Sequence, residues 1–298
     1  MNQLALYKSQ ATKRSRAVST VKRRPLRFLI VPVLRHALLL TASGIVLFPF
    51  LWMVFASFKP AEDIFLDTFH LLPTTWEFGN YAAAWQEAPF DQFFINSIAS
   101  AAISVTGQVL TCTLAAYGFA KLNFWGKKFF FTLLLTCMMI PDEAAIIPNF
   151  LFAKNVGLLD TWLGLSLTSL TSVFGIFLLR QTFMTIPNDL IYASKIDGCN
   201  ELQSFCHVVL PCARSSVATL ALLAFLDSWN AYMWPMVVTY QNTTRTLQIG
   251  LKYLIKPDLG PQWPMIMAAS TFILLPVLLL FVGLQRYFVE GMVKTGIK

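Results

Sequence analysis

The chain has 298 residues, of which 56% are hydrophobic and only 13% are charged. Average soluble domains carry about 25% charged residues, so a soluble protein of this composition would expose large apolar patches to water. The net charge of +8 does not indicate nucleic-acid binding, because most of the chain is too apolar to form a basic face.

Six apolar segments are long enough to cross a bilayer, which needs about 20 residues per helix. In chain order they cover about residues 36–58, 92–120, 129–153, 161–184, 215–239 and 264–285. The charged residues inside them are Asp142, Glu143, Arg180 and Asp227. The sequence therefore predicts an all-α fold, a transmembrane bundle of six spans.

Charge in the connecting segments predicts the orientation of the spans. Residues 1–35 contain nine basic residues and no acid, whereas residues 59–91 contain six acids and one lysine. Because basic segments stay in the cytoplasm, both termini are predicted to be cytoplasmic. The basic stretch is too long, and the apolar run after Arg35 too extended, for a cleavable signal peptide.

Five cysteines occur, and none forms a CxxC motif. Cys199, Cys206 and Cys212 fall in the predicted cytoplasmic loop, where reduced thiols are expected. Together with His207 they offer zinc-ligand chemistry, but their spacing fits no standard zinc pattern. No metal site is predicted.

The loop that follows the fourth segment, at about 185–211, has the sequence signals of two short helices. Pro187 suits the start of a helix, and Gly198 suits a left-handed C-terminal cap. Asn200 and Gln203 have the spacing of a capping box, which predicts the start of a second helix.

The second short helix is predicted to be amphipathic and to end before the fifth span. Leu202, Phe205 and Val209 recur at i, i+3 and i+7, which predicts one apolar stripe. Pro211 is predicted to break the chain before the next segment. Such a stripe is buried either against a partner protein or against the membrane surface.

This loop resembles the EAA loop of ABC importer permeases, in the run from Ala193 to Gly198 and in Pro211, thirteen residues later. The resemblance covers most of residues 76–291. Further matching motifs are Asn80-Tyr81 after Trp76, Asn96-Ser97, the run from Ala116 to Lys121, Gly126, Met139-Ile140-Pro141, Trp229-Asn230, Trp234-Pro235 and the run from Gln285 to Gly291. The tail and six-span layout look like the smaller permease of carbohydrate-uptake systems, such as those for maltose, other oligosaccharides or glycerol 3-phosphate.

The resemblance implies that the loop docks in a cleft of a cytoplasmic ATPase subunit. The implied coupling residues are Tyr192, Ala193, Ser194, Asp197, Gly198, Leu202, Phe205 and Pro211. The family usually has a glutamate where this chain has Tyr192, so the ionic contact of that glutamate is missing here. Asp197 is either a docking contact or a local helix-end residue, since Gly198 beside it already explains the helix end.

The resemblance also implies the surroundings of the chain. It implies a multi-pass protein of a prokaryotic cell membrane that works with a second permease subunit, an ATPase dimer and an external solute-binding protein. The ATPase would bind ATP and magnesium, and this chain itself would bind no cofactor. The domains implied are a basic cytoplasmic segment (1–35), the permease domain (36–291) and a cytoplasmic tail (292–298).

Polar residues inside the spans are candidates for the solute pathway, because charge within a membrane usually faces a cavity. Asp227, Asn230 and Trp234 are spaced i, i+3 and i+7, so one helical face would combine hydrogen-bonding groups with an aromatic surface. Helix packing by Asn230 is the alternative. Asp142 and Glu143 beside Pro141 indicate either a broken helix at the pathway or the outer surface of the membrane.

Two other classes of protein remain as alternatives. A secondary transporter would use ion-coupling residues and internal repeats, and six spans show no repeated half. A membrane enzyme would need a catalytic motif, and no HExxH or GxSxG motif occurs in the chain. The chain also lacks a phosphate-binding GxxxxGK[ST] loop, because Gly126-Lys127 has neither the preceding glycine nor the following hydroxyl residue.

Overall fold

The computed structural model describes residues 27–64, 70–256 and 260–296. Contacts along the chain divide it into two compact units, Met1–Trp52 and Met53–Lys298. The first unit contains most of the long helix α2 (Arg27–Ala56). All the sites described below lie in the second unit.

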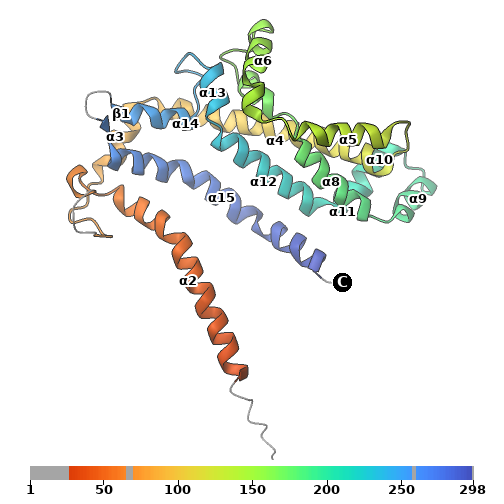
Figure 1. The fold of residues 1–298 in the computed structure, drawn as a ribbon, viewed down its shortest axis with the longest axis horizontal. Helices are drawn as coiled ribbons and strands as arrows, with labels where there is room; N and C mark the ends of the chain where they lie inside the picture. The colour runs from red at the N-terminus through yellow and green to blue at the C-terminus, as the bar shows by residue number, and fades with distance from the viewer. Residues whose placement is uncertain (1–26, 65–69, 257–259, 297–298) are drawn as a thin grey trace, which may run out of the picture. The chain divides into compact units, whose positions relative to one another are not determined.

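The second unit is almost entirely helical (Figure 1). Its first half contains η1 (Ala61–Asp63), α3 (Gly79–Glu87), α4 (Phe90–Lys121), α5 (Lys127–Cys137), α6 (Asp142–Asn155), α7 (Trp162–Ser166), η2 (Leu167–Ser169) and α8 (Val173–Thr185). Its second half contains α9 (Asn188–Ile196), α10 (Glu201–Ser204), the π-helix η3 (Phe205–Val209), α11 (Leu210–Cys212), α12 (Arg214–Asn230), α13 (Met233–Val238), α14 (Leu247–Gly250), η4 (Leu251–Leu254) and α15 (Trp263–Gly296). Two short antiparallel strands, β1 (Ile255–Lys256) and β2 (Gly260–Pro261), form a small hairpin.

Six membrane spans are accounted for by single helices and bent pairs. Three helices are long and apolar enough to cross a membrane alone, namely α2, α4 and α15. Three bent helix pairs pass the same test of length and composition: α5 with α6 (98°), α7–η2 with α8 (56°), and the α10–α11 segment with α12 (82°). In the last pair only α12 lies within the predicted fifth span, at about 215–239. The predicted all-α bundle of six spans is confirmed, although only half of the spans are single continuous helices.

Proline and serine explain where the spans break. Pro141 is extended (ψ 138°) at the N-cap of α6 and has no N–H to continue α5. The hydroxyl of Ser172 caps α8 by accepting a hydrogen bond from the Gly175 N–H. Pro211 lies inside α11, and the break before α12 falls two residues later, at Ala213, rather than at the proline.

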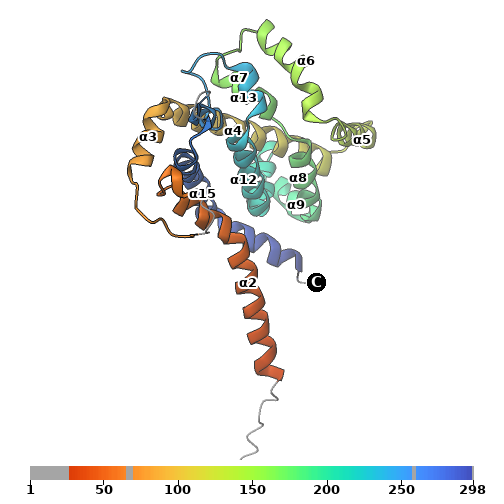
Figure 2. The same ribbon diagram turned by 60° about the vertical axis from the view of Figure 1, so that its left-hand side comes forward.

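Helix α4 is the central element of the second unit, because α8 and α12 both pack along it and α15 packs against α12 (Figure 2). Three buried clusters fill the spaces between helices. One joins α4, α8 and the α9–α11 hairpin around Tyr117, Phe183 and Phe205. A second surrounds Phe90 and Trp229, and a third surrounds Trp234.

Candidate functional site

The predicted coupling loop folds into a compact helical hairpin, α9 followed by α10, η3 and α11. Gly198 follows α9 with a φ of +92°, the left-handed conformation expected of a C-terminal cap. Asn200 and Gln203 form the expected capping box, because each side chain accepts a hydrogen bond from the backbone N–H of the other. These local predictions are confirmed.

Polar contacts hold the two arms of the hairpin together and tie it to α4. The hydroxyls of Ser194 and Ser204 are both buried and share a hydrogen bond of 2.8 Å. Glu201 forms an ion pair with Lys195 (2.6 Å), and its carboxylate accepts a hydrogen bond from the Tyr117 hydroxyl of α4 (2.6 Å). Ser194 therefore serves the internal packing of the hairpin, whereas Ala193 beside it is exposed.

The predicted apolar stripe of Leu202, Phe205 and Val209 is wrong. Phe205 and Val209 are buried in the cluster around Tyr117, but Leu202 is 63% exposed. The π-helix over Phe205–Val209 breaks the α-helical spacing on which the prediction rested, so Leu202 and Val209 do not share one face.

A different set of apolar side chains faces outward from the hairpin. Ile196 is 86% exposed, and Tyr192 and Leu202 are also largely exposed. Asp197 is exposed as well and occupies the C-cap of α9, next to Gly198. An exposed apolar group of this kind on a polar hairpin is typical of a surface that packs against a partner.

All five candidates for the solute pathway line one cavity of about 1100 Å³. The cavity lies where the α5–α6 bend, the η2–α8 break and the C-terminal end of α12 meet. Asp142 and Glu143 line it from the first turn of α6, and Asp227 and Asn230 line it from α12. The two pairs are about 85 residues apart in the sequence, and the bend between α5 and α6 allows both to line the same cavity.

The prediction of one helical face for Asp227, Asn230 and Trp234 is wrong, because the helix ends at Asn230. Pro235 would clash with the carbonyl of Ala231 in a continuous helix, and the backbone of Ala231 is extended instead (ψ 128°). Trp234 lines the cavity from α13 but is only 8% exposed. Its indole N–H donates to the Gly164 carbonyl over 2.9 Å, so this ring mainly packs α13 against α7.

The cavity also contains polar residues that the sequence did not single out. Gln108 lines it from the middle of α4, a helix whose other amide side chains, Gln92 and Asn96, lie near its start. The remaining polar side chains of the lining come from α6 and the η2–α8 break, and they are Asn149, Thr168, Ser169, Thr171 and Ser172. A polar amide within a predicted span was the available signal for Gln108.

The carboxylate of Asp160 joins two connecting segments that are predicted to lie on the external side. One oxygen accepts hydrogen bonds from the backbone N–H groups of Tyr240 (2.7 Å) and Gln241 (3.1 Å) and from the Thr244 hydroxyl (2.7 Å). Burial raises the pKa of Asp160, but these hydrogen bonds and the charge of Arg245 outweigh it, so its pKa lies below the usual value. Asp160 has a left-handed backbone (φ 55°).

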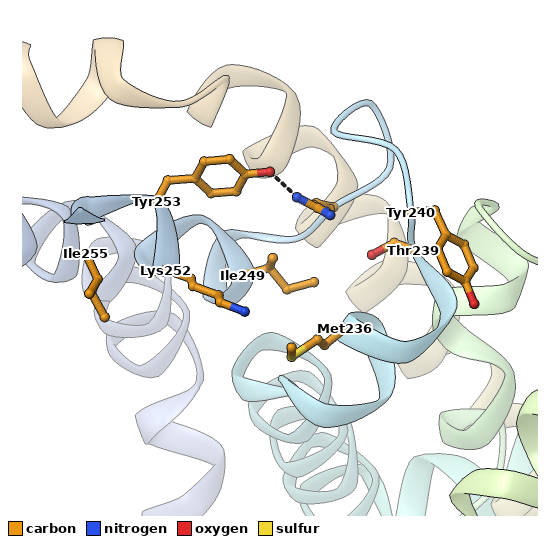
Figure 3. A pocket seen from close by; sticks show the side chains of 8 residues that line it. Met236, Thr239, Tyr240, Ile249, Lys252, Tyr253 and Ile255 are labelled. Carbon is orange, nitrogen blue, oxygen red and sulfur yellow. Dashed lines mark hydrogen bonds between the residues drawn. The ribbon is translucent and has the colours of Figure 1, made fainter. Parts of the chain in front are cut away.

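A smaller cavity of about 470 Å³ lies beside these segments (Figure 3). Met236, Ile249 and Ile255 supply apolar walls, and Lys252 and Arg245 supply positive charge. The Arg245 guanidinium donates a hydrogen bond to the Tyr253 hydroxyl, the contact drawn as a dashed line in Figure 3. The two cavities thus have opposite charge.

The chain is similar to known membrane components of transport systems. Residues 108–294 match the family model described as "binding-protein-dependent transport system inner membrane component". The arabinooligosaccharides transport system permease protein AraQ of Halalkalibacterium halodurans is 33% identical over 85% of this chain and 92% of its own length. The sn-glycerol-3-phosphate transport system permease protein UgpE of Yersinia pestis is 30% identical over 87% of this chain and 95% of its own length.

A solved structure shares the arrangement of helices. A chain of a bacterial ABC transporter that imports the acidic polysaccharide alginate matches with a TM-score of 0.76 and 25% identity, over 87% of this chain and 96% of that chain. The likeness extends beyond the matched family region, since it covers 87% of this chain. The chain therefore belongs to the family of inner membrane components of binding-protein-dependent transport systems, and it is a multi-pass permease component of an ABC importer.

Proposed function

We propose that this chain forms half of the translocation pathway for a sugar or sugar-like solute, and that the cavity of about 1100 Å³ is its part of that pathway. The observation that carries the proposal is the meeting of Asp142, Glu143, Asp227 and Asn230 at one space between bent spans. Polar groups are costly against lipid and are kept where they meet water, solute or a partner. The named substrates of the relatives, arabinooligosaccharides, sn-glycerol 3-phosphate and alginate, are all sugars or sugar-like.

Substitutions on α12 test the pathway. Asp227→Asn and Asn230→Ala should lower uptake per assembled complex while leaving assembly intact, because both side chains line the cavity. Ser228→Ala is the matched control, since Ser228 lies between them on α12 but does not line the cavity. Normal uptake combined with a lower melting temperature in Asp227→Asn would assign this face to helix packing instead.

We further propose that the α9–α11 hairpin docks on a cytoplasmic ATPase dimer, which binds ATP and magnesium, and that a second permease and an external solute-binding protein complete the importer. The exposed group of Tyr192, Ile196 and Leu202 supports the docking, because it gives the hairpin an apolar contact surface. The fixed shape of the hairpin, closed by the Ser194–Ser204 hydrogen bond, suits transmission of motion. Asp197, which follows Ile196 at the C-cap of α9, is a candidate ionic contact with the ATPase.

Copurification tests the docking proposal. Ile196→Asp places a charge at the most exposed of the three apolar side chains and should reduce the ATPase retained on the purified permease, with normal membrane insertion. Cys206→Ser is the matched control, because Cys206 is exposed on the same hairpin and the change is small. Full retention of the ATPase by Ile196→Asp would contradict the proposed docking surface.

A further inference from the structure

The large cavity has a single sign of charge. Its lining includes three carboxylates, those of Asp142, Glu143 and Asp227. No lysine or arginine lines it within the described part of the chain, in contrast to the smaller cavity with Arg245 and Lys252. A concave surface lined by one sign of charge between low-dielectric walls repels ions of that sign and concentrates the opposite sign.

The other polar groups of the cavity suit hydroxyl groups. Asn149 and Asn230 each offer an amide donor and acceptor, and the hydroxyls of the η2–α8 break both donate and accept. Phe152 and Phe174 line the same space and are half exposed, which provides apolar faces for the carbon skeleton of a sugar ring.

Gln108 is the clearest candidate for a direct contact with the solute. Its side chain is only 5% exposed but lines the cavity. The amide makes no hydrogen bond among the described residues and is not one of the fully buried side-chain groups that lack a partner, so its polar atoms open onto the cavity. A polar group in that position bonds water when the cavity is empty, and a solute hydroxyl would replace that water.

We propose that this cavity accepts an uncharged, hydroxyl-rich solute, disfavours solutes that carry phosphate or carboxylate groups, and uses the Gln108 amide as a specificity-determining contact. The proposal rests on the proposed function, since it assigns a substrate class to the same cavity. The negative charge rejects anions, and the amides and hydroxyls select for hydroxyl groups because an unmatched buried polar group discriminates strongly.

A native thiol makes the charge of the cavity measurable without any transport. Cys137 lines the cavity, and Cys206 is exposed on the hairpin outside it. In the assembled importer, both thiols are treated with a cationic and an anionic methanethiosulfonate, and modification is followed by mass spectrometry. We expect the cation-to-anion rate ratio at Cys137 to exceed that at Cys206 by about tenfold or more, as counter-ion focusing in a charged cleft predicts.

Neutralising the three carboxylates together (Asp142→Asn, Glu143→Gln and Asp227→Asn) should bring the ratio at Cys137 down to that at Cys206. Equal ratios in the unmodified protein, or a preference for the anionic reagent, would overturn the charge selection. Failure of a small neutral reagent to reach Cys137 would overturn it too, because the cavity would then be closed to solutes. In an importer that still transports, the wrong rate ratio would leave the proposed function standing, whereas a closed cavity would also remove this cavity from the proposed pathway.

Protection of Cys137 from N-ethylmaleimide tests the role of Gln108. Arabinotriose, as a neutral probe, should slow alkylation by about twofold at half-saturation, and sn-glycerol 3-phosphate should not. Gln108→Leu should lose the protection while its melting temperature stays nearly unchanged, because the amide opens onto the cavity and makes no hydrogen bond among the described residues.

The matched control is Ser104→Ala, one turn earlier on α4. The Ser104 hydroxyl is fully buried without a partner among the described residues, and it does not line the cavity. Ser104→Ala should therefore keep the protection by arabinotriose. Full protection in Gln108→Leu, or a marked loss of stability with it, would show that the amide serves the fold and not the solute.

Discussion

Asp160 is expected to stabilise the fold by linking the segment that follows α6 to the segment that follows α13. Asp160→Ala removes a carboxylate oxygen that accepts three hydrogen bonds, and it places alanine at a φ of 55°. Hydrogen bonds to a charged group contribute about 1.5–3 kcal/mol each when buried, and partial exposure reduces this. A left-handed backbone costs a non-glycine residue about 1–2 kcal/mol. Together these terms predict a destabilisation of about 3 kcal/mol or more.

Asp160→Asn is the matched comparison. Asparagine tolerates the left-handed backbone, and its amide oxygen still accepts hydrogen bonds, so only the charge is lost and the cost should be about 1 kcal/mol. The assay is thermal unfolding of the detergent-extracted chain, read separately from solute uptake. If the alanine variant melts no lower than the asparagine variant, the hydrogen bonds of Asp160 do not hold the two segments together.

The pH dependence gives an independent check on Asp160. Its pKa is lowered in the folded chain from the ordinary value of 3.8, so its ionised form stabilises the fold above that value. This stability is lost as the pH falls through the lower, folded-state pKa. The difference in melting temperature between the unmodified chain and Asp160→Asn should be constant near pH 7 and shrink below about pH 4. A difference that persists unchanged in acid would contradict this assignment.

Three further predictions concern the hairpin, a tight helix contact and the topology. Gly198→Val should impair assembly with the ATPase, because a β-branched residue resists the φ of +92°, whereas Gly198→Asn should be tolerated. If both variants retain the same amount of ATPase in copurification, this turn is not required for assembly. Gly164→Ala should lower the melting temperature strongly, since the new Cβ would lie 2.0 Å from the Leu158 carbonyl oxygen, and an unchanged melting curve would contradict that contact. An impermeant thiol reagent on intact cells should label Gln241→Cys and spare Cys206, and external labelling of Cys206 would reverse the predicted orientation.

Local signals in the sequence predicted local structure well. Gly198 and the Asn200–Gln203 capping box were predictable because each depends on the conformation of a few neighbouring residues. The exposure of Leu202 was not, because the π-helix that follows it has no simple sequence signal. Trp234 was misplaced although Pro235 was visible, since a proline in an apolar run is compatible with a kinked span as well as with a broken one.

Long-range relations explain most of what the sequence did not reveal. The sequence predicted that Asp142 and Asp227 matter, but not that they share a cavity, because that depends on the 98° bend between α5 and α6. Asp160 looked like an ordinary acidic loop residue, since its partners lie about 80 residues further along the chain. Gln108 was overlooked because an amide within an apolar span is equally typical of helix packing.

The hydrogen bond between Tyr117 and Glu201 gives the hairpin a mechanical connection to the cavity. Tyr117 and Gln108 belong to the same uninterrupted helix, α4, and nine residues of α-helix extend about 14 Å. An α-helix is stiff along its axis. Helix α4 therefore links the hairpin, which it contacts at Tyr117, rigidly to the cavity wall, to which it contributes Gln108. We therefore expect a displacement of the hairpin along that axis to reach the cavity wall through the backbone of α4 itself.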